Sequence, residues 1–140
     1  MRHLVRLTLV LLALLMLYAV LGLASNNSPS EPRGLYRLTH EPLQRGRYVV
    51  LKMPLKQIAG VPGDTVRTAP EGSYVNGQLW PKSGIPAGVR EHFPFGTYVL
   101  RPGQLWVLGD HPLSFDSRYF GMVPDTLVNA TAEPLLTTEE

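Results

Sequence analysis

Hydrophobic residues form one unbroken run near the N-terminus. From Leu7 to Leu23 no residue carries a charge, and extending the run back to Leu4 gives about 20 residues. A helix of that length spans about 30 Å, the thickness of a bilayer core. The pattern therefore predicts one N-terminal transmembrane helix, within an anchor segment that covers residues 1–24.

A cleavable signal peptide is the alternative for this segment. Gly22-Leu23-Ala24 has the small-x-small form of a cleavage site after Ala24. The apolar run is longer than the hydrophobic region of most signal peptides, about 7–15 residues, which favours a retained anchor. Arg2 and Arg6 precede the run, and the next Lys or Arg is Arg33, which favours an N-terminus in the cytoplasm. Both interpretations put the remaining chain on the outer face of the membrane.

Beyond residue 24 the apolar residues come in short runs separated by Gly, Pro and Asn, and no run keeps a helical period for three turns. This pattern is typical of a mostly-β domain, a small coiled sheet or partly closed barrel. Asn76-Gly77 between two such runs is the strongest hairpin signal in the chain. Short strands are predicted at Tyr48–Met53, Leu55–Ala59, around Val66, and at Tyr74-Val75, Gln78–Trp80, Thr97–Leu100, Leu105–Leu108 and Tyr119–Val123.

The chain of 140 residues is long enough for one compact domain after the anchor, and we expect it over residues 25–125. Residues 126–140 end in Thr-Thr-Glu-Glu, and we expect them to form a loose C-terminal tail. There is no cysteine, and the four histidines lack metal-ligand spacing, so we expect no metal and no cofactor.

The charge balance gives little support to nucleic-acid binding. The chain has 13 basic and 11 acidic residues, and removing Arg2 and Arg6 leaves 13 − 2 = 11 basic residues against 11 acidic ones. The region after residue 24 is therefore neutral, without the clustered positive surface that nucleic acids require.

The stretch SPSEPRGLY, which begins at Ser28, is stiff for a linker that leaves a membrane. Pro29 and Pro32 each push the preceding residue toward an extended conformation. In an extended strip, residues two apart face the same way, so Ser28 and Ser30 would present their hydroxyls side by side. Gly34 would then allow a tight turn that returns the chain to the domain.

A serine hydroxyl becomes a useful nucleophile when a base lies beside it. Asp110-His111 is a poor relay, because extended backbone points adjacent side chains apart. The three lysines are Lys52, Lys56 and Lys82. If its segment is a strand, Lys56 shares a face with Ile58, and an apolar wall would lower its pKa from about 10.4 toward the range of a general base. The alternative is an ordinary surface lysine.

A third cluster of polar side chains follows the predicted strand at Leu105–Leu108. Ser114, Asp116 and Arg118 stand at two-residue spacing, and in an extended segment they would line one face. Asp116 could then pair with Arg118, which would leave the Ser114 hydroxyl for another donor. The alternative is a polar loop with a surface ion pair of little energetic value.

Together the three segments resemble the type I signal peptidase family of Ser/Lys membrane proteases, most closely its TraF-like branch of conjugative-transfer peptidases. The resemblance runs from the anchor to Gly121 and rests on three motifs in the family's order: Ser30-x-Pro32-x-Gly34-Leu35-Tyr36, Leu55-Lys56-Gln57-Ile58-Ala59-Gly60-Val61-Pro62-Gly63-Asp64, and Gly109-Asp110 followed by Ser114-x-Asp116-Ser117-Arg118-Tyr119-Phe120-Gly121. It implies a small, partly closed β-barrel of signal-peptidase type.

The resemblance also implies a role for each matched residue. Ser30 would be the nucleophile and Lys56 its general base, while Ser28 would join the Ser30 N–H in the oxyanion hole. Ser114 would hydrogen-bond the lysine, and the last two matched residues, Asp116 and Arg118, would support the site. Two positions depart from the family pattern without removing a catalytic group: Glu31 stands where an apolar residue is common, and His111 where the general signal peptidases have Asn.

The implied function is a membrane-anchored serine endopeptidase of the bacterial cytoplasmic (inner) membrane, single-pass, with its catalytic domain on the periplasmic, outer face. Its partners would be the lipid bilayer, other conjugative-transfer or secretion components, and a pilin or exported precursor as protein substrate. The acyl-enzyme would be released by water or by an amine, and a pilin's own N-terminus as that amine would give a cyclic product. A general type I signal peptidase and a non-catalytic scaffold of a secretion or pilus complex are the alternatives.

Overall fold

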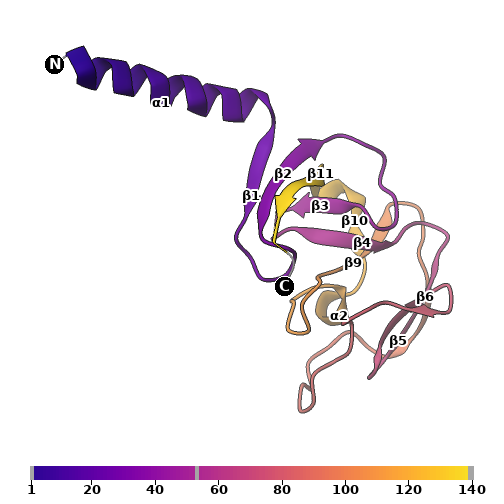
Figure 1. The fold of residues 1–140 in the computed structure, drawn as a ribbon. Helices are drawn as coiled ribbons and strands as arrows, with labels where there is room; N and C mark the ends of the chain where they lie inside the picture. Colours follow the sequence, from indigo (N-terminus) through magenta and orange to yellow (C-terminus); the bar gives the residue numbers. More distant parts are fainter. Residues whose placement is uncertain (1, 53, 139–140) are drawn as a thin grey trace.

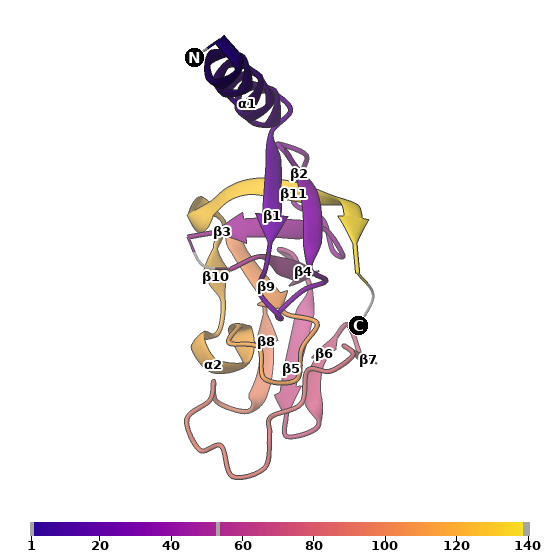
Figure 2. The same cartoon turned by 60° about the vertical axis from the view of Figure 1, so that its left-hand side comes forward.

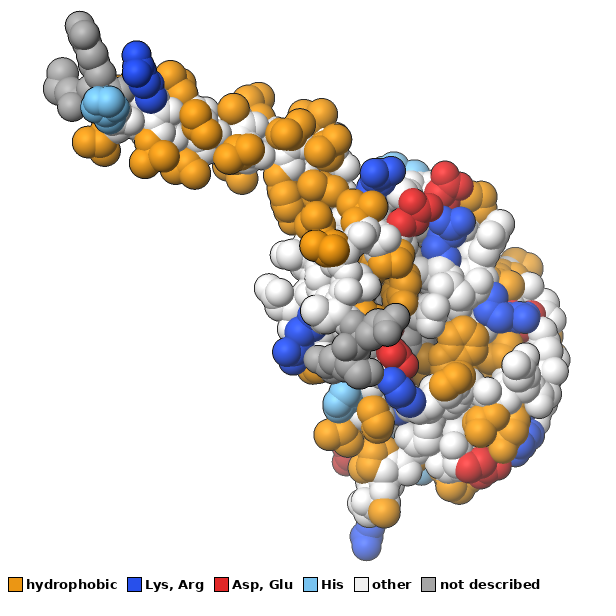
Figure 3. All heavy atoms as spheres, viewed as in Figure 1, with side chains coloured by type: hydrophobic (Ala, Val, Ile, Leu, Met, Phe, Trp, Pro, Cys, Tyr) orange, Lys and Arg blue, Asp and Glu red, His pale blue; other side chains and the backbone are white. Residues whose placement is uncertain are grey.

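The computed structural model describes residues 2–52 and 54–138 of the chain. An N-terminal helix, α1 (Arg2–Val20), extends away from a body made almost entirely of strands (Figure 1). Apolar side chains cover the visible face of the helix (Figure 3), and the span His3–Val20, with a mean hydropathy of 2.2, is not buried by the body. The helix is about 28 Å long, so it is long and apolar enough to cross a bilayer. The predicted apolar N-terminal helix is confirmed.

The larger of two sheets has seven antiparallel strands. They are β1 (Leu23–Asn26), β2 (Gly34–Thr39), β3 (Tyr48–Leu51), β4 (Lys56–Gly60), β9 (Gln104–Leu108), β10 (Val123–Pro124) and β11 (Val128–Thr137). Their order is β1-β2-β11-β3-β4-β9-β10. Strand directions turn strongly across the sheet, so it is coiled rather than flat (Figures 1 and 2).

A smaller sheet contains four antiparallel strands in the order β7-β6-β5-β8. They are β5 (Thr65–Ala69), β6 (Gly72–Val75), β7 (Gln78–Leu79) and β8 (Gly96–Val99). Asn76 and Gly77 join β6 to β7 with φ of 51° and 85°, the left-handed conformation that a two-residue hairpin loop requires. The predicted Asn-Gly hairpin is confirmed, as is the mostly-β class with a coiled sheet behind one N-terminal helix.

Strands β4 and β9 lie between two hydrophobic clusters. Leu105 and Val107 of β9 face a cluster with Ile58 of β4, whereas Trp106 faces another with Ala59. Both strands are thus buried on both faces, and each large side chain removed from water contributes about 1.5–3 kcal/mol. This makes β4, which begins at Lys56, a rigid support.

The expectation of a loose tail after Asp125 is wrong. A short 3-10 helix (Asp125–Leu127) leads into β11, which pairs with β2 on one side and with β3 on the other. Small residues of β11 fit this central position, and Ala130 and Ala132 are buried. Alanine has a low β propensity, so the strand gives no signal in the sequence.

The role expected for Gly34 is also wrong. This residue opens β2 instead of making a tight turn. Its φ is 149°, and a side chain there would overlap the carbonyl of Leu136 in β11. Gly34 is therefore required by a close approach between two strands.

The predicted strand Tyr119–Val123 is wrong except at its last residue. Ser117–Phe120 form a one-turn helix, α2, and the strand β10 begins only at Val123. The segment from Ser114 to Arg118 is consequently not extended. For the predicted strand Tyr48–Met53, β3 ends at Leu51, and Met53 lies outside the described residues.

Candidate active site

The turn between β1 and β2 carries Ser28 and Ser30. Its backbone is held by the buried side chain of Asn26, the last residue of β1. The Asn26 amide nitrogen donates to the carbonyls of Ser28 (3.2 Å), Glu31 (3.0 Å) and Pro32 (3.2 Å), and its amide oxygen accepts from the Ser28 N–H (3.1 Å). One side chain thus determines the shape of the whole turn.

The extended strip predicted for this stretch is wrong. Pro29 and Ser30 form a turn, and Ser28 and Ser30 approach each other across it. The Ser28 hydroxyl accepts a hydrogen bond from the Ser30 backbone N–H at 3.2 Å. The two groups assigned to the oxyanion hole are therefore adjacent, through a serine turn rather than through strand alternation.

The Ser30 turn packs against the end of β9. The Asp110 N–H donates to the Ser30 carbonyl. At the preceding residue, Gly109, an added Cβ would lie 2.9 Å from that carbonyl and would overlap the Ser114 hydroxyl. Gly109 is therefore the point where the nucleophile turn and the Ser114 loop come together, and the contact requires a residue without a side chain.

Lys56 begins β4 and points into the protein, with 1% of its surface exposed. Its backbone pairs with Val49 of β3. On the other side Gln57 is opposite Leu108, so the antiparallel register carries Lys56 to the level of Gly109. The Lys56 amine donates to the Ser114 hydroxyl at 2.9 Å. Lys56 is consequently not the surface lysine of the alternative interpretation.

The electrostatic surroundings of Lys56 favour its neutral form. Burial lowers the pKa of the amine below its ordinary value, and Arg118 acts in the same direction. Asp116 and Glu31 oppose this shift by raising the pKa of Lys56. Among the residues that the structure describes, no ion pair joins Lys56 to a carboxylate. Desolvation dominates, as predicted from the apolar face that Lys56 shares with Ile58.

Asp116 and Arg118 form a buried ion pair at 2.8 Å, not the surface pair of the alternative interpretation. Asp116 caps α2 through the Arg118 N–H and accepts from the Gly109 N–H at 2.9 Å. The Arg118 guanidinium donates to five backbone carbonyls, those of Lys82, Gly84, His111, Pro112 and Ser114. Because every nitrogen of the Arg118 guanidinium donates a hydrogen bond, the Asp116–Arg118 pair holds the Ser114 loop in place beside Lys56.

The structure brings the six predicted residues into one region. The β1–β2 turn supplies Ser30, with Ser28 at its N–H; β4 supplies Lys56, and the segment that follows β9 supplies the remaining three. Within residues 2–52 and 54–138, no hydrogen bond joins the Lys56 amine to the Ser30 hydroxyl. The amine is bound to Ser114 instead. Catalytic hydrogen bonds are often long in a free enzyme and shorten when the substrate binds.

Three contributors were not assigned a role from the sequence. Asn26 holds the turn, Gly109 permits the central contact, and the Ser117 hydroxyl accepts from the Val107 N–H at 2.9 Å to tie α2 to β9. Gly109 stands in a recognised motif and could have been noticed there. Asn26 carries the Asx signal for a turn, but it is preceded by a predicted anchor rather than by a predicted strand.

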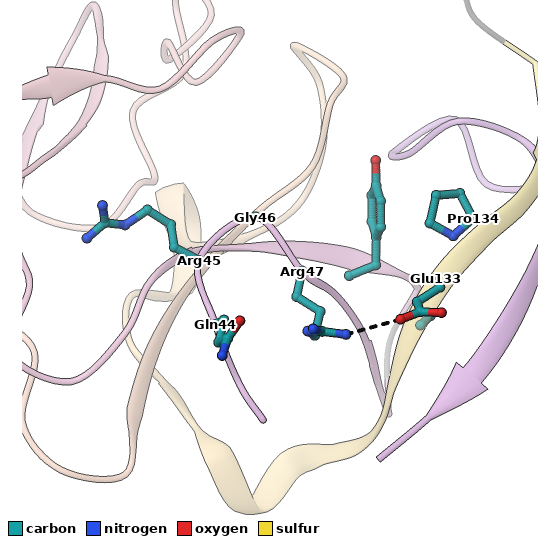
Figure 4. A pocket seen from close by; sticks show the side chains of 8 residues that line it. Gln44, Arg45, Gly46, Arg47, Glu133 and Pro134 are labelled. Atoms are coloured by element: carbon teal, nitrogen blue, oxygen red, sulfur yellow. Dashed lines mark hydrogen bonds and ion pairs between the residues drawn. The ribbon is translucent and has the colours of Figure 1, made fainter. Parts of the chain in front are cut away.

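Ala132 of β11 lines two cavities. One of about 330 Å³ adjoins Ser28 and is lined mainly by apolar and small side chains, among them Ala24, Tyr36, Leu38 and Leu55. The other, about 310 Å³, lies between the segment before β3 and β11 and contains the partly exposed pair Arg47–Glu133 (Figure 4). Of these two cavities, only the first is lined by a predicted site residue, Ser28.

The chain is similar to signal peptidases and to conjugal transfer proteins. The family model described as signal peptidase, peptidase S26, matches residues 2–136. The conjugal transfer protein TraF of Agrobacterium fabrum is 28% identical over 147 residues, which cover 83% of this chain and 83% of the relative. A probable signal peptidase I-2 of Synechocystis is 38% identical over 71 residues, 50% of this chain and 32% of the relative.

A solved signal peptidase I from Enterococcus faecalis has a TM-score of 0.46 and 23% identity, over 66% of this chain and 97% of that chain. The family model spans nearly the whole sequence, from α1 to β11. The chain therefore belongs to the signal peptidase family of serine peptidases, in its TraF-like branch, and carries that family's peptidase domain behind one N-terminal apolar helix.

Proposed function

We propose that this protein is a membrane-anchored endopeptidase with a Ser30/Lys56 dyad, which matures a pilin-like or exported precursor during conjugative transfer. One observation carries the proposal: the amine of Lys56 is buried, unpaired with any carboxylate among the described residues, and hydrogen-bonded to Ser114 beneath the Ser30 turn. A desolvated amine of this kind is suited to act as a general base near neutral pH.

In the first step, neutral Lys56 takes the proton of the Ser30 hydroxyl as the oxygen attacks the scissile carbonyl. The resulting oxyanion accepts hydrogen bonds from the Ser30 N–H and the Ser28 hydroxyl. These two groups bond each other in the free enzyme, so the oxyanion would take the place of the Ser28 oxygen at the Ser30 N–H. Collapse breaks the C–N bond, and the Lys56 ammonium returns the proton to the leaving amine.

The second step releases the acyl group from Ser30. Water or a substrate amine attacks the ester, Lys56 accepts its proton, and Ser30 regains a hydrogen as the C–O bond breaks. Ser114 orients the Lys56 amine throughout, and the Asp116–Arg118 pair holds Ser114. If the pilin's own N-terminus is the attacking amine, the product is cyclic.

The anchor gives this chemistry a location. Helix α1 ends at Val20, and β1 starts at Leu23 and leads directly into the Ser30 turn. This short connection keeps the nucleophile near the bilayer surface, where a membrane-inserted precursor is cleaved. With Arg2 and Arg6 in the cytoplasm, the catalytic domain would lie on the periplasmic face of the inner membrane.

A general type I signal peptidase is the second candidate. The match to a probable signal peptidase I-2, at 38% identity over half of this chain, favours it. The TraF relative is matched over a larger share of both proteins, which favours the conjugative role. The apolar cavity beside Ser28 would suit small side chains near the cut in either case.

Co-expression with a pilin precursor and, separately, with a model preprotein tests the proposal. The wild type should trim the pilin, whereas Ser30→Ala and Lys56→Ala should leave it intact. Mass spectrometry of the trimmed product then separates a cyclic form, lighter by one water, from a linear one. Cleavage of the preprotein alone would favour the general signal peptidase. A Lys56→Ala protein that still matures its substrate would overturn the dyad.

A further inference from the structure

Glu31 is a buried acid beside the nucleophile. It follows Ser30 directly, and only 2% of its surface is exposed. Neither carboxyl oxygen has a hydrogen-bond partner among the described residues, whereas the carboxyl of the equally buried Asp116 accepts from Gly109 and Arg118. An unpartnered carboxyl in the interior is costly, so its retention beside Ser30 needs an explanation.

The groups that act on Glu31 come from every neighbouring element. Lys56 of β4 attracts its negative charge, while Asp110 and Asp116, from the segment after β9, repel it. The backbone N–H of Gln57 also favours the charged form of Glu31, although its position does not make a hydrogen bond with the carboxyl. Burial raises the pKa of the phenols of Tyr36 on β2 and Tyr48 on β3, and the negative charge of Glu31 raises both pKa values further.

Burial dominates this balance. It raises the pKa of Glu31 to about 8, against the opposing attraction of Lys56. The carboxyl therefore keeps its proton at neutral pH and loses it as the pH rises through about 8. The interaction is reciprocal: ionised Glu31 raises the pKa of Lys56, and protonated Glu31 does not.

We propose that Glu31 is a positioning residue that acts through Lys56: a buried acid without a hydrogen-bond partner, set beside the nucleophile, whose charge decides whether the Lys56 amine holds its proton. The inference rests on the proposed Ser30/Lys56 dyad. Protonated Glu31 leaves the amine free to act as a base. Ionised Glu31 strengthens the hold of Lys56 on its proton and so opposes the first step.

The three lysines of the chain allow a direct test. Full-length protein with ¹³C at the lysine Cε position, in detergent micelles and without substrate, should show three signals, assigned with Lys→Arg variants of Lys52 and Lys82. Below about pH 8 the Lys56 signals of Glu31→Gln and of the wild type should coincide, because Glu31 is uncharged there; above about pH 8 only the wild-type signal should move toward that of the protonated amine. Glu91→Gln, which removes an exposed carboxyl, should follow the wild type throughout.

The wild type provides a second measurement that needs no variant. Its Lys56 signal should show a further inflection near pH 8, where Glu31 loses its proton. In cleavage assays, kcat/KM of the wild type should fall below that of Glu31→Gln as the pH rises through about 8, where ionised Glu31 raises the pKa of Lys56. Glu31→Asp, which keeps the acid, should restore part of the difference.

The outcomes separate this inference from the dyad itself. A Lys56 midpoint that is the same in the wild type and in Glu31→Gln, together with a single wild-type inflection, would overturn the role of Glu31 and leave the dyad standing. Full cleavage by Lys56→Ala would overturn the dyad, whatever the titration shows.

Discussion

The nucleophile turn and the lysine strand meet at one glycine but are held by different forces. Ser30 lies in a turn whose backbone is fixed by hydrogen bonds from Asn26 and Asp110. Lys56 lies on a central strand whose other buried side chains, such as Ile58 and Ala59, pack into two hydrophobic clusters. Polar contacts thus determine the position of the nucleophile, and apolar packing determines that of the base.

This difference has a chemical basis. A nucleophile must be aligned with its substrate, and in a turn directional hydrogen bonds are the available means of fixing a backbone. A lysine must lose water to lose its charge, so it belongs in a packed interior. Changes to the strand should therefore affect protonation, and changes to the turn should affect alignment.

Replacing Lys56 by Met should have the largest effect. Met fills a similar volume without an amine, so the strand should stay packed while the base is lost. We expect kcat/KM to fall roughly 10²–10⁴-fold, the usual contribution of a general base. The melting temperature should not fall, because a desolvated amine is removed from the interior. A parallel loss of folding, seen by circular dichroism, would contradict the separation of packing from chemistry.

Gly109→Ala tests the meeting point of the two regions. The new methyl group would overlap the Ser114 hydroxyl, displacing it from Lys56, and would crowd the Ser30 carbonyl. We expect a loss of activity on the order of a hundredfold, the effect of a displacement of about 1 Å.

Gly46→Ala is the control for Gly109→Ala. Gly46 has open space around it and a φ of 85°. Alanine there should cost about 1 kcal/mol of stability through backbone strain, with cleavage unchanged. Equal activity of the two alanine variants would show that the turn and the strand do not depend on contact at Gly109.

Asn26→Ala should have a moderate effect. It removes the side chain that donates to three carbonyls of the turn, and each lost bond of this kind costs about 0.5–1.5 kcal/mol. We expect kcat to fall about tenfold, with KM little changed, because alignment rather than binding is lost. The exposed neighbour Asn27 is the matched control. An Asn26→Ala enzyme as active as Asn27→Ala would refute the role of this clamp.

Lys82→Ala should have the smallest effect. Lys82 pairs with Asp110 at 3.2 Å next to the site, but both side chains are about half exposed. Exposed pairs contribute about 0–1 kcal/mol, so activity should change less than about fivefold. A loss of activity as large as that of Asn26→Ala would mean that the ion pair with Lys82, and not its own backbone, keeps Asp110 in position.

The sequence predicts the lysine strand better than the nucleophile turn. Apolar alternation around Lys56 depends on local pattern, and the hairpin at Asn76-Gly77 depends on two adjacent residues. Both signals can be recognised in a short stretch of sequence, without knowledge of the rest of the fold. The same pattern allowed a buried Lys56 but left a surface lysine as the alternative, which the structure overturns.

Features that depend on distant contacts were not predictable. The strand β11 is a strand because β2 and β3 lie on either side of it, and its alanines and threonines reveal little. The Ser30 segment is a turn because Asn26 supplies its hydrogen bonds, which outweigh the preference of pre-proline residues for extended backbone. Asp116 caps a helix because Gly109 and Arg118 converge on it.

The most direct measurement is the capture of the acyl-enzyme by rapid acid quench and mass spectrometry of full-length enzyme mixed with precursor. An ester should form on the peptide that contains Ser30, should be missing in Ser30→Ala, and should form at least a hundredfold more slowly in Lys56→Met. An adduct on a different residue, or one that forms at the wild-type rate without the amine, would contradict the assignment of nucleophile and base.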